Sequence, residues 1–220
     1  MILIYKINFK KALLILFIFN YYSVFCILKL YSIMKKIVVF ASGSGSNAEN
    51  IIKHFKKNKI AKVVSVFTNN AAAKVIERAK NHQIPTEIFS KNELLNRNIL
   101  EKIQEIDPDL IVLAGFLLKF PDNIIEKFPN KIINIHPALL PNYGGKGMYG
   151  MHIHRAIIEN KEKETGISIH YVNENYDEGA IIFQKHIALN ENDTAETVAE
   201  KIHELEQKYF PEIISRLLED

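Results

Sequence analysis

The sequence predicts a doubly wound α/β domain, and three observations lead to this fold class. Short apolar runs rich in β-branched residues alternate with amphipathic segments from residue 34 onward, which is typical of a mainly parallel sheet. A glycine-rich loop, 42–47, follows the first of these runs. Near the C-terminus two apolar runs flank a link rich in Asn, Asp and Gly, so part of the sheet should be antiparallel. We therefore expect one Rossmann-like domain over 34–220.

Charge is distributed unevenly along the chain. Residues 1–33 contain four lysines and no acidic residue, and removing these four from the 28 basic residues leaves 24, against 25 acidic residues. The domain is thus nearly neutral and gives no indication of a nucleic-acid-binding surface. The single cysteine, Cys26, lies in residues 1–33, so the domain has no cysteine nucleophile or thiolate metal ligand.

Residues 1–33 differ in composition from the rest. Residues 12–28 are almost entirely apolar, but they are at the short limit of a membrane span. The segment 23–26 does not fit a signal-peptide cleavage site. Met34, two lysines and an apolar run resemble the start of a cytoplasmic protein. We favour an upstream extension outside the fold, with no membrane contact; a signal anchor and a signal peptide are the alternatives.

The first half of the domain should alternate regularly between strands and helices. Strands are expected at 36–41, 62–68, 86–89 and 110–114. Helices are expected after the loop 42–47 and at 72–82, 92–106 and 121–128.

The second half is expected to begin with a strand at 132–136, ended by Pro137. A glycine-rich loop, a helix and two strands follow, at 142–150, 151–160, 166–171 and 180–187. Asp193 and Glu196 match a capping box for a last helix, in which Pro211 should cause a kink or an interruption.

The loop after the first strand predicts a phosphate site. Gly43, Gly45 and Ala48 match the pattern G-x-G-x-x-G/A, and a helix N-terminus holds anions on its free N–H groups. A dinucleotide site also needs an acidic residue about 20 residues further on, but the second strand ends at Asn69 and Asn70. We therefore favour a phosphate over NAD. The structural alternative is a tight turn in which Ser46 and Glu49 form a capping box.

Two polar residues are set into the strand at 132–136. Asn134 and His136 share one face because side chains alternate along a strand. Ligands of open α/β sheets bind at the carboxyl ends of the strands, so this pair is a candidate site. A satisfied polar pair at a strand end is the alternative. Ser168 and His170 also share a face of their strand.

Three further features have a functional and a structural interpretation. The apolar loop 115–120 is either core packing or a wall for a flat ring. Glu206 borders the apolar stripe of the last helix and is a solvated acid unless a site recruits it. His152 and His154 are two residues apart, so they do not share a helix face, and we expect no metal site.

The motifs together resemble a known family. They are the run 37–47, the segment Val-Leu-Ala-Gly-Phe at 112–116, the string Asn-Ile-His-Pro-Ala-Leu-Leu-Pro at 134–141, and Asp-Glu-Gly at 177–179. This set is similar to the folate-dependent formyltransferases, and in particular to the phosphoribosylglycinamide formyltransferase family. The resemblance covers 34 to about 218.

The resemblance implies an activity and a set of site residues. The family transfers the formyl group of 10-formyltetrahydrofolate to the amine of 5-phosphoribosylglycinamide in de novo purine (IMP) biosynthesis. It implies a catalytic trio of Asn134, His136 and Asp177. The implied ribonucleotide-binding residues are Gly45, Ser46, Asn47, His203 and Glu206. The implied folate-binding residues are Leu117, Leu118, Lys119, Phe120, Asn134, Asn173, Glu174, Asn175, Tyr176 and Asp177.

The residue chemistry suits this reaction. A neutral amine is itself a nucleophile, so the absence of cysteine is no obstacle. Asn134 and a protonated His136 are suitable donors to a developing oxyanion, and a nearby carboxylate favours the charged imidazole. We expect Asp177 to orient His136 and to raise its pKa.

Other functions remain open at this point. Methionyl-tRNA formyltransferase is expected to need a further C-terminal domain, and formyltetrahydrofolate hydrolase an N-terminal regulatory domain. A non-catalytic nucleotide-binding module would use the glycine-rich loop alone, which leaves the catalytic trio unexplained. The expected partners are the two small-molecule substrates, without nucleic acid, and both a monomer and a homodimer are compatible with the sequence.

Overall fold

The computed structural model describes residues 34–219, and the hypotheses on residues 1–33 concern a segment outside this range. The strands are β1 (Lys35–Phe40), β2 (Ala61–Thr68), β3 (Thr86–Ile88), β4 (Leu110–Leu113), β5 (Ile132–His136), β6 (Glu164–Tyr171) and β7 (Ile181–Ala188). The helices are α2 (Ser46–Lys57), α3 (Val75–Asn81), α4 (Lys91–Leu95), α5 (Arg97–Ile106), α6 (Asp122–Lys127), α7 (Met151–Glu159) and α8 (Ala195–Glu219). No helix in the described range has the length and apolar character of a membrane span.

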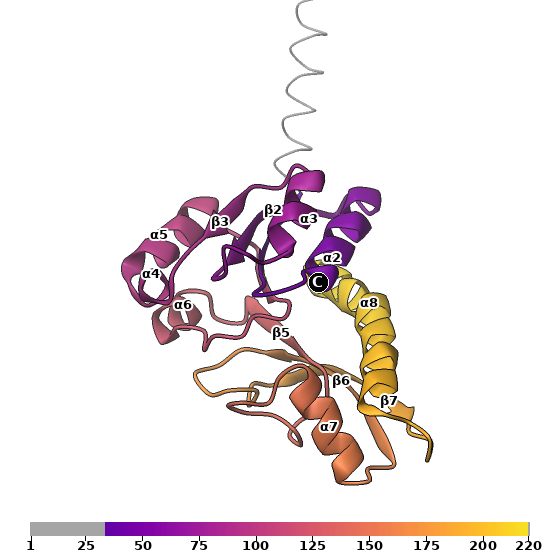
Figure 1. Ribbon diagram of the computed structural model, residues 1–220. Coiled ribbons are helices and arrows are strands. Elements are labelled where there is room, and N and C mark those ends of the chain that lie inside the picture. Colours follow the sequence, from indigo (N-terminus) through magenta and orange to yellow (C-terminus); the bar gives the residue numbers. More distant parts are fainter. Residues whose placement is uncertain (1–33, 220) are drawn as a thin grey trace, which may run out of the picture. The chain divides into compact units, whose positions relative to one another are not determined.

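The strands form one twisted sheet in the order β3-β2-β1-β4-β5-β6-β7 (Figure 1). Pairing is parallel from β3 to β5 and antiparallel between β5, β6 and β7. The predicted doubly wound sheet with an antiparallel C-terminal portion is therefore confirmed. The chain order reverses between β1 and β4, and such a switch point is where open α/β sheets bind ligands.

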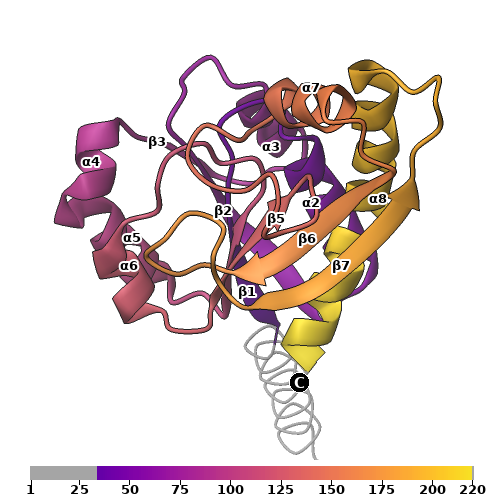
Figure 2. The same cartoon turned by 90° about the horizontal axis from the view of Figure 1, so that it is seen from below.

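Helices cover both faces of the sheet (Figures 1 and 2). Ile37 and Val39 of β1 face a core shared with α2, α3 and α8, whereas Val38 and Phe40 face a second core shared with α4, α5 and α6. The alternation of a strand assigns successive residues to these two cores. Because β1 is buried on both faces, its sequence is a continuous apolar run.

The apolar loop 115–120 closes one end of the second core. The ring of Phe40 lies 5.4 Å from that of Phe116 and 5.1 Å from that of Phe120, both in edge-on geometry. Phe120 is buried, while Leu117 is half exposed. The core-packing interpretation of this loop is therefore confirmed for its aromatic rings, whereas a wall for a flat ring at the exposed Leu117 stays a prediction.

Three local predictions are wrong, and two of them lie in the first half of the domain. The helix predicted at 92–106 is two helices, because Asn96 is extended and α4 has its own capping box from Ser90 and Glu93. Ser46 and Glu49 form no capping box, because the N-cap is Gly45 and the Glu49 carboxylate instead binds Arg78 and His82.

At the start of α8 the side chain of Thr194, and not Asp193, accepts a hydrogen bond from the Thr197 N–H at 3.3 Å. Asp193 is held by Lys201, with both carboxylate oxygens 2.7 Å from the ammonium nitrogen. The helix continues through Pro211 to residue 219, so the predicted interruption at this proline does not occur. Pro211 is buried.

Candidate active site

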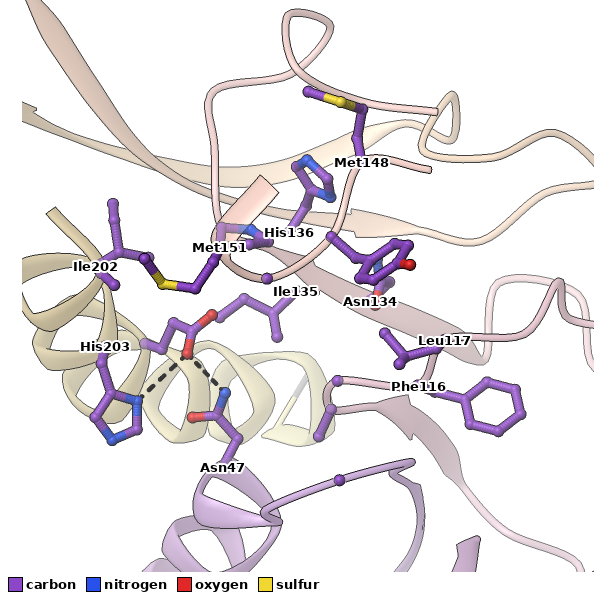
Figure 3. A pocket seen from close by; sticks show the side chains of 18 of the residues that line it. Asn47, Phe116, Leu117, Asn134, Ile135, His136, Met148, Met151, Ile202 and His203 are labelled. Atoms are coloured by element: carbon purple, nitrogen blue, oxygen red, sulfur yellow. Dashed lines mark hydrogen bonds and ion pairs between the residues drawn. The ribbon is translucent and has the colours of Figure 1, made fainter. Parts of the chain in front are cut away.

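A cavity of about 670 Å³ opens at the carboxyl edge of the sheet. Its lining comes from the loop after β1, the end of β5, the loop before α7, and α8 (Figure 3). The parallel strands β1, β4 and β5 all end at this edge, so residues far apart in the sequence converge there. A second recess of about 60 Å³ lies beside it, lined by the loop 116–120 and the segment 172–177.

The structure brings nearly all of the predicted site residues to these two cavities. The large cavity is lined by Gly45, Ser46, Asn47, Leu117, Asn134, His136, Tyr176, Asp177, His203 and Glu206. The smaller one is lined by Leu118, Lys119, Phe120, Asn134, Asn173, Asn175, Tyr176 and Asp177. Glu174 lines neither cavity.

At one end of the large cavity, the N-terminus of α2 meets α8. Gly45 has a φ of 72° and ends the loop, and the first N–H groups of α2 lack partners within the helix. Asn47 Nδ2 donates to Glu206 at 2.9 Å, and His203 Nδ1 lies 3.6 Å from the same carboxylate (Figure 3). Glu206 raises the pKa of His203, against the opposing effect of burial. The Glu206 side chain is only 14% exposed. The alternative interpretation of Glu206 as a solvated acid is therefore wrong.

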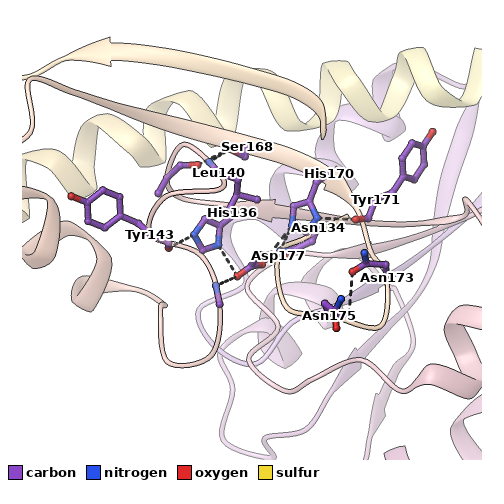
Figure 4. A network of polar contacts seen from close by, with 12 residues as sticks. Asn134, His136, Leu140, Tyr143, Ser168, His170, Tyr171, Asn173, Asn175 and Asp177 are labelled. Atoms are coloured by element: carbon purple, nitrogen blue, oxygen red, sulfur yellow. Dashed lines mark hydrogen bonds and ion pairs between the residues drawn. The ribbon is translucent and has the colours of Figure 1, made fainter. Parts of the chain in front are cut away.

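At the other end, Asn134, His136 and Asp177 form one polar network with His170 (Figure 4). Asp177 Oδ2 lies 3.6 Å from His136 Nδ1, and its Oδ1 lies 3.6 Å from His170 Nε2. The Asn134 amide nitrogen lies 3.1 Å from His170 Nε2 and 3.4 Å from Asp177 Oδ1. The network is placed by pairing of β5 with β6, in which Asn134 opposes His170 and His136 opposes Ser168.

Each of the two imidazole rings has one nitrogen within hydrogen-bond distance of a backbone carbonyl oxygen. His136 Nε2 lies 2.8 Å from the Tyr143 carbonyl oxygen, so it carries a proton and leaves Nδ1 directed at Asp177. His170 Nδ1 lies 2.8 Å from the Tyr171 carbonyl oxygen, and its Nε2 lies 3.1 Å from the Asn134 amide nitrogen. Asp177 Oδ2 accepts from the Gly145 N–H at 2.9 Å. The loop before α7 is thereby attached to both His136 and Asp177.

The net pKa shift of His136 corrects one expectation. Burial lowers the pKa of His136, and Asp177 acts in the expected upward direction without overcoming it. Burial alone would raise the pKa of Asp177, but the His170 and His136 rings and the Gly145 N–H hold it below its ordinary value. These two shifts favour a neutral imidazole at His136 beside a charged carboxylate at Asp177.

The sequence predicts for His154 only that it binds no metal together with His152, yet the structure places it in the cavity. It lies on α7, lines the large cavity and is 5% exposed, and its Nδ1 is buried without a hydrogen-bond partner. Burial lowers its pKa. Residues 34–219 contain no cluster of three potential metal ligands. The burial of His154 could have been predicted from its place on α7 beside the apolar residues Ile153 and Ile157.

The fold and the cavities define a class of protein: a doubly wound α/β protein with a glycine-rich loop and a polar cluster at the carboxyl edge of its sheet. Residues 35–214 match the model of the formyl transferase family. The chain is 39% identical over 191 residues to the phosphoribosylglycinamide formyltransferase of Bacillus subtilis, with 84% of this chain and 95% of that protein covered.

Other relatives agree with this match. The phosphoribosylglycinamide formyltransferase of Escherichia coli is 34% identical, with 81% of this chain and 85% of that protein covered. The crystal structure of the phosphoribosylglycinamide formyltransferase from Bacillus halodurans superimposes with a TM-score of 0.76 at 34% identity, over 84% of this chain and 95% of that one. The chain belongs to the formyl transferase family, and the resemblance inferred from its motifs is confirmed.

Proposed function

We propose that this chain transfers the formyl group of 10-formyltetrahydrofolate to the amine of 5-phosphoribosylglycinamide, a step of de novo purine biosynthesis. The observation that carries the proposal is one cavity with a phosphate-type loop at one end and the Asn134–His136–Asp177 network at the other. The relatives' names point to the same reaction.

The ribonucleotide would lie along the large cavity. Its phosphate would bind the free N–H groups at Gly45, Ser46 and Asn47, since helix N-termini attract anions. Glu206 would accept hydrogen bonds from the ribose hydroxyls, and His203, whose pKa Glu206 raises, would add positive charge nearby. This orientation directs the glycinamide amine toward His136.

The folate would approach from the smaller recess. Leu117 and Tyr176 are among the exposed large apolar side chains of the described residues, and they would contact a flat ring. The remaining members of this folate-binding set are Leu118, Lys119, Phe120, Asn134, Asn173, Glu174, Asn175 and Asp177. The formyl carbon would then lie beside the catalytic trio, where the two cavities share Asn134 and Asp177.

The reaction needs an oxyanion donor and a proton carrier. The amine nitrogen attacks the formyl carbon, the carbonyl oxygen becomes an oxyanion, and the bond to N10 of the folate then breaks. Asn134 would donate to the oxyanion, because its contact to Asp177 is long at 3.4 Å and easily exchanged. One such donor contributes about 10²–10³ in rate.

His136 would carry the proton. Its neutral Nδ1 accepts the proton that the amine loses, and the resulting imidazolium donates it to N10, so the proton balance closes within the site. Asp177, 3.6 Å away, stabilises the imidazolium while it exists. This replaces the expected resting-state cation with a transient one, because burial keeps the ring neutral beforehand.

The same proposal extends to the organisation of the protein. We propose that 34–220 forms the formyltransferase domain, that residues 1–33 lie outside it, and that the enzyme acts in the cytoplasm on small molecules. Folate serves as a co-substrate in this scheme, with no metal and no nucleic acid involved.

A direct assay tests the function. The purified full chain is incubated with 10-formyltetrahydrofolate and 5-phosphoribosylglycinamide, and the formylated ribonucleotide is measured by mass spectrometry. Release of formate instead would indicate the hydrolase alternative. Thermal stabilisation by NAD alone, with no formyl transfer, would overturn the proposal in favour of a nucleotide-binding module.

A further inference from the structure

We propose that Arg78 is a positioning residue for the phosphate of the ribonucleotide. Its guanidinium binds the Ser44 carbonyl and the Glu49 carboxylate, and it thereby keeps both away from the N–H groups that would hold the phosphate. This inference rests on the proposed function and deepens it. Arg78 is on α3, lines neither cavity, and lies behind the loop Gly43–Gly45.

The first observation is that α3 binds the carbonyl oxygens of the loop. The Val75 N–H donates to the Gly43 carbonyl at 3.2 Å, and Arg78 Nε donates to the Ser44 carbonyl at 2.9 Å. The Gly45 carbonyl accepts from the Glu49 N–H at 2.9 Å within the first turn of α2. Three consecutive carbonyls are thus directed at donors of the protein. A carbonyl turned toward a bound phosphate would repel it, so these contacts favour an N–H-lined cradle.

The second observation concerns a carboxylate in the phosphate-binding turn. Glu49 lies in the first turn of α2 and is 17% exposed, so its charge is poorly screened by water. Arg78 Nη1 forms an ion pair with Glu49 Oε2. His82 Nε2 and Lys53 Nζ lie 3.3 Å and 2.9 Å from the other oxygen.

These partners keep Glu49 ionised and compensated. Lys53, then Arg78 and His82, lower the pKa of Glu49 to about 2 against the effect of burial. Removing Arg78 would therefore leave an ionised carboxylate, compensated by the exposed Lys53 and by His82, beside the site for a dianionic phosphate. Arg78 is the partner that also binds the loop, so it couples the two effects.

The test compares three variants for the Michaelis constant of the ribonucleotide. Arg78→Met should raise this KM by about tenfold, the size expected for a lost charge-assisted hydrogen bond and its charge. Glu49→Gln/Arg78→Met should recover to about threefold above wild type, because the carboxylate that has lost its Arg78 partner is gone while the Ser44 contact is still missing. Arg78→Lys keeps the charge but not the forked geometry, so it should match the double variant at about threefold.

Two internal controls separate positioning from general damage. kcat and the KM for 10-formyltetrahydrofolate should stay within about twofold of wild type in every variant, since the chemical step and the folate recess lie elsewhere. Lys80→Met removes an exposed base two residues further along α3 and should leave the ribonucleotide KM unchanged. The inhibition constant of inorganic phosphate, as a competitor, should rise in parallel with that KM.

Defined outcomes overturn the inference. An unchanged ribonucleotide KM in Arg78→Met, no recovery in the double variant, or an equal rise with Lys80→Met would each contradict it. If Arg78→Met does not fold, Arg78→Lys and the double variant still test the predicted equality. A wild-type chain without formyl transfer would refute the proposed function instead, so the two failures are distinguishable.

Discussion

His136 is the residue on which the proposed chemistry depends most. It is 3% exposed, and its two ring nitrogens are directed at the Tyr143 carbonyl and at Asp177. The sequence placed it correctly on a shared face with Asn134, because strand periodicity is a local property. The sequence did not reveal its net pKa shift, because burial of the ring depends on the loop before α7.

His136→Ala should lower kcat by about 10²–10⁴, the usual contribution of a positioned proton carrier. His186→Ala, at an exposed histidine of β7, is the matched control and should leave kcat unchanged. Steady-state assays measure the activity of each variant, and circular dichroism shows whether the variant is folded. Retention of near wild-type turnover by the folded His136→Ala protein would remove His136 from the proposed role.

Asp177→Asn tests the electrostatic pairing. Asp177 raises the pKa of His136 against burial, so its neutralisation should lower that pKa further. If neutral His136 accepts the proton, activity is lost as the pH falls through its pKa, and the acid limb of the kcat profile should move to lower pH. Turnover should also fall, by about 10²-fold, because the transient imidazolium loses its partner. A pH profile at saturating substrates measures the limb, and an unmoved limb would contradict this assignment.

At the scale of elements, the loop between β1 and α2 is fixed by its contact with α3. Gly45 has a φ of 72°, and a Cβ there would approach Val75 Cβ to 2.5 Å. Gly43 has no atom within 4 Å of the equivalent position. The two glycines of the motif therefore have different structural requirements, which the sequence pattern alone treats as equal.

Gly45→Ala should destabilise the protein by at least about 1–2 kcal/mol, from the left-handed backbone and the contact with Val75. It should also raise the ribonucleotide KM, because the first turn of α2 shifts. Gly43→Ala is the control and should leave the unfolding free energy nearly unchanged. Chemical denaturation measures both, and equal stability of the two variants would contradict the steric explanation.

The element boundaries show which local signals decide structure. Ser90 and Glu93 match a capping box in the sequence, and this signal could have located α4, but the long apolar periodicity through 106 obscured it. Ser46 and Glu49 match a similar pattern and form no box, because Arg78, distant in sequence, binds the carboxylate. A local motif is thus overridden where a tertiary partner binds its side chain more strongly.

At the scale of the whole molecule, residues 35–219 contain all of the strands and helices described, both large cores and both cavities. Contacts within the chain also separate residues 35–220 as a compact unit. Where the catalytic domain begins stays a prediction, which truncation of the chain can test.

Removal of residues 1–33 should leave the melting temperature and kcat of the remaining chain within experimental error of the full chain. The reason is that no residue of the sheet, the cores or the proposed site is lost. Calorimetry and the formyl-transfer assay measure both quantities. A large loss of either would contradict the assignment of residues 1–33 to a segment outside the fold. Mass spectrometry of the native N-terminus tests the start-site hypothesis separately.

The sequence by itself predicted the fold class, and strand periodicity singled out Asn134 and His136, because periodicity acts between near neighbours. Asp177 and Glu206 became candidates through the resemblance of the motifs to a known family. Only the tertiary structure decided that Asn47 donates to Glu206 across 159 positions, that Arg78 donates to the Ser44 carbonyl of the glycine-rich loop, and that burial outweighs the effect of Asp177 on the pKa of His136. Those outcomes depend on which distant groups share a low-dielectric space, and this is fixed by packing of the two cores against the sheet.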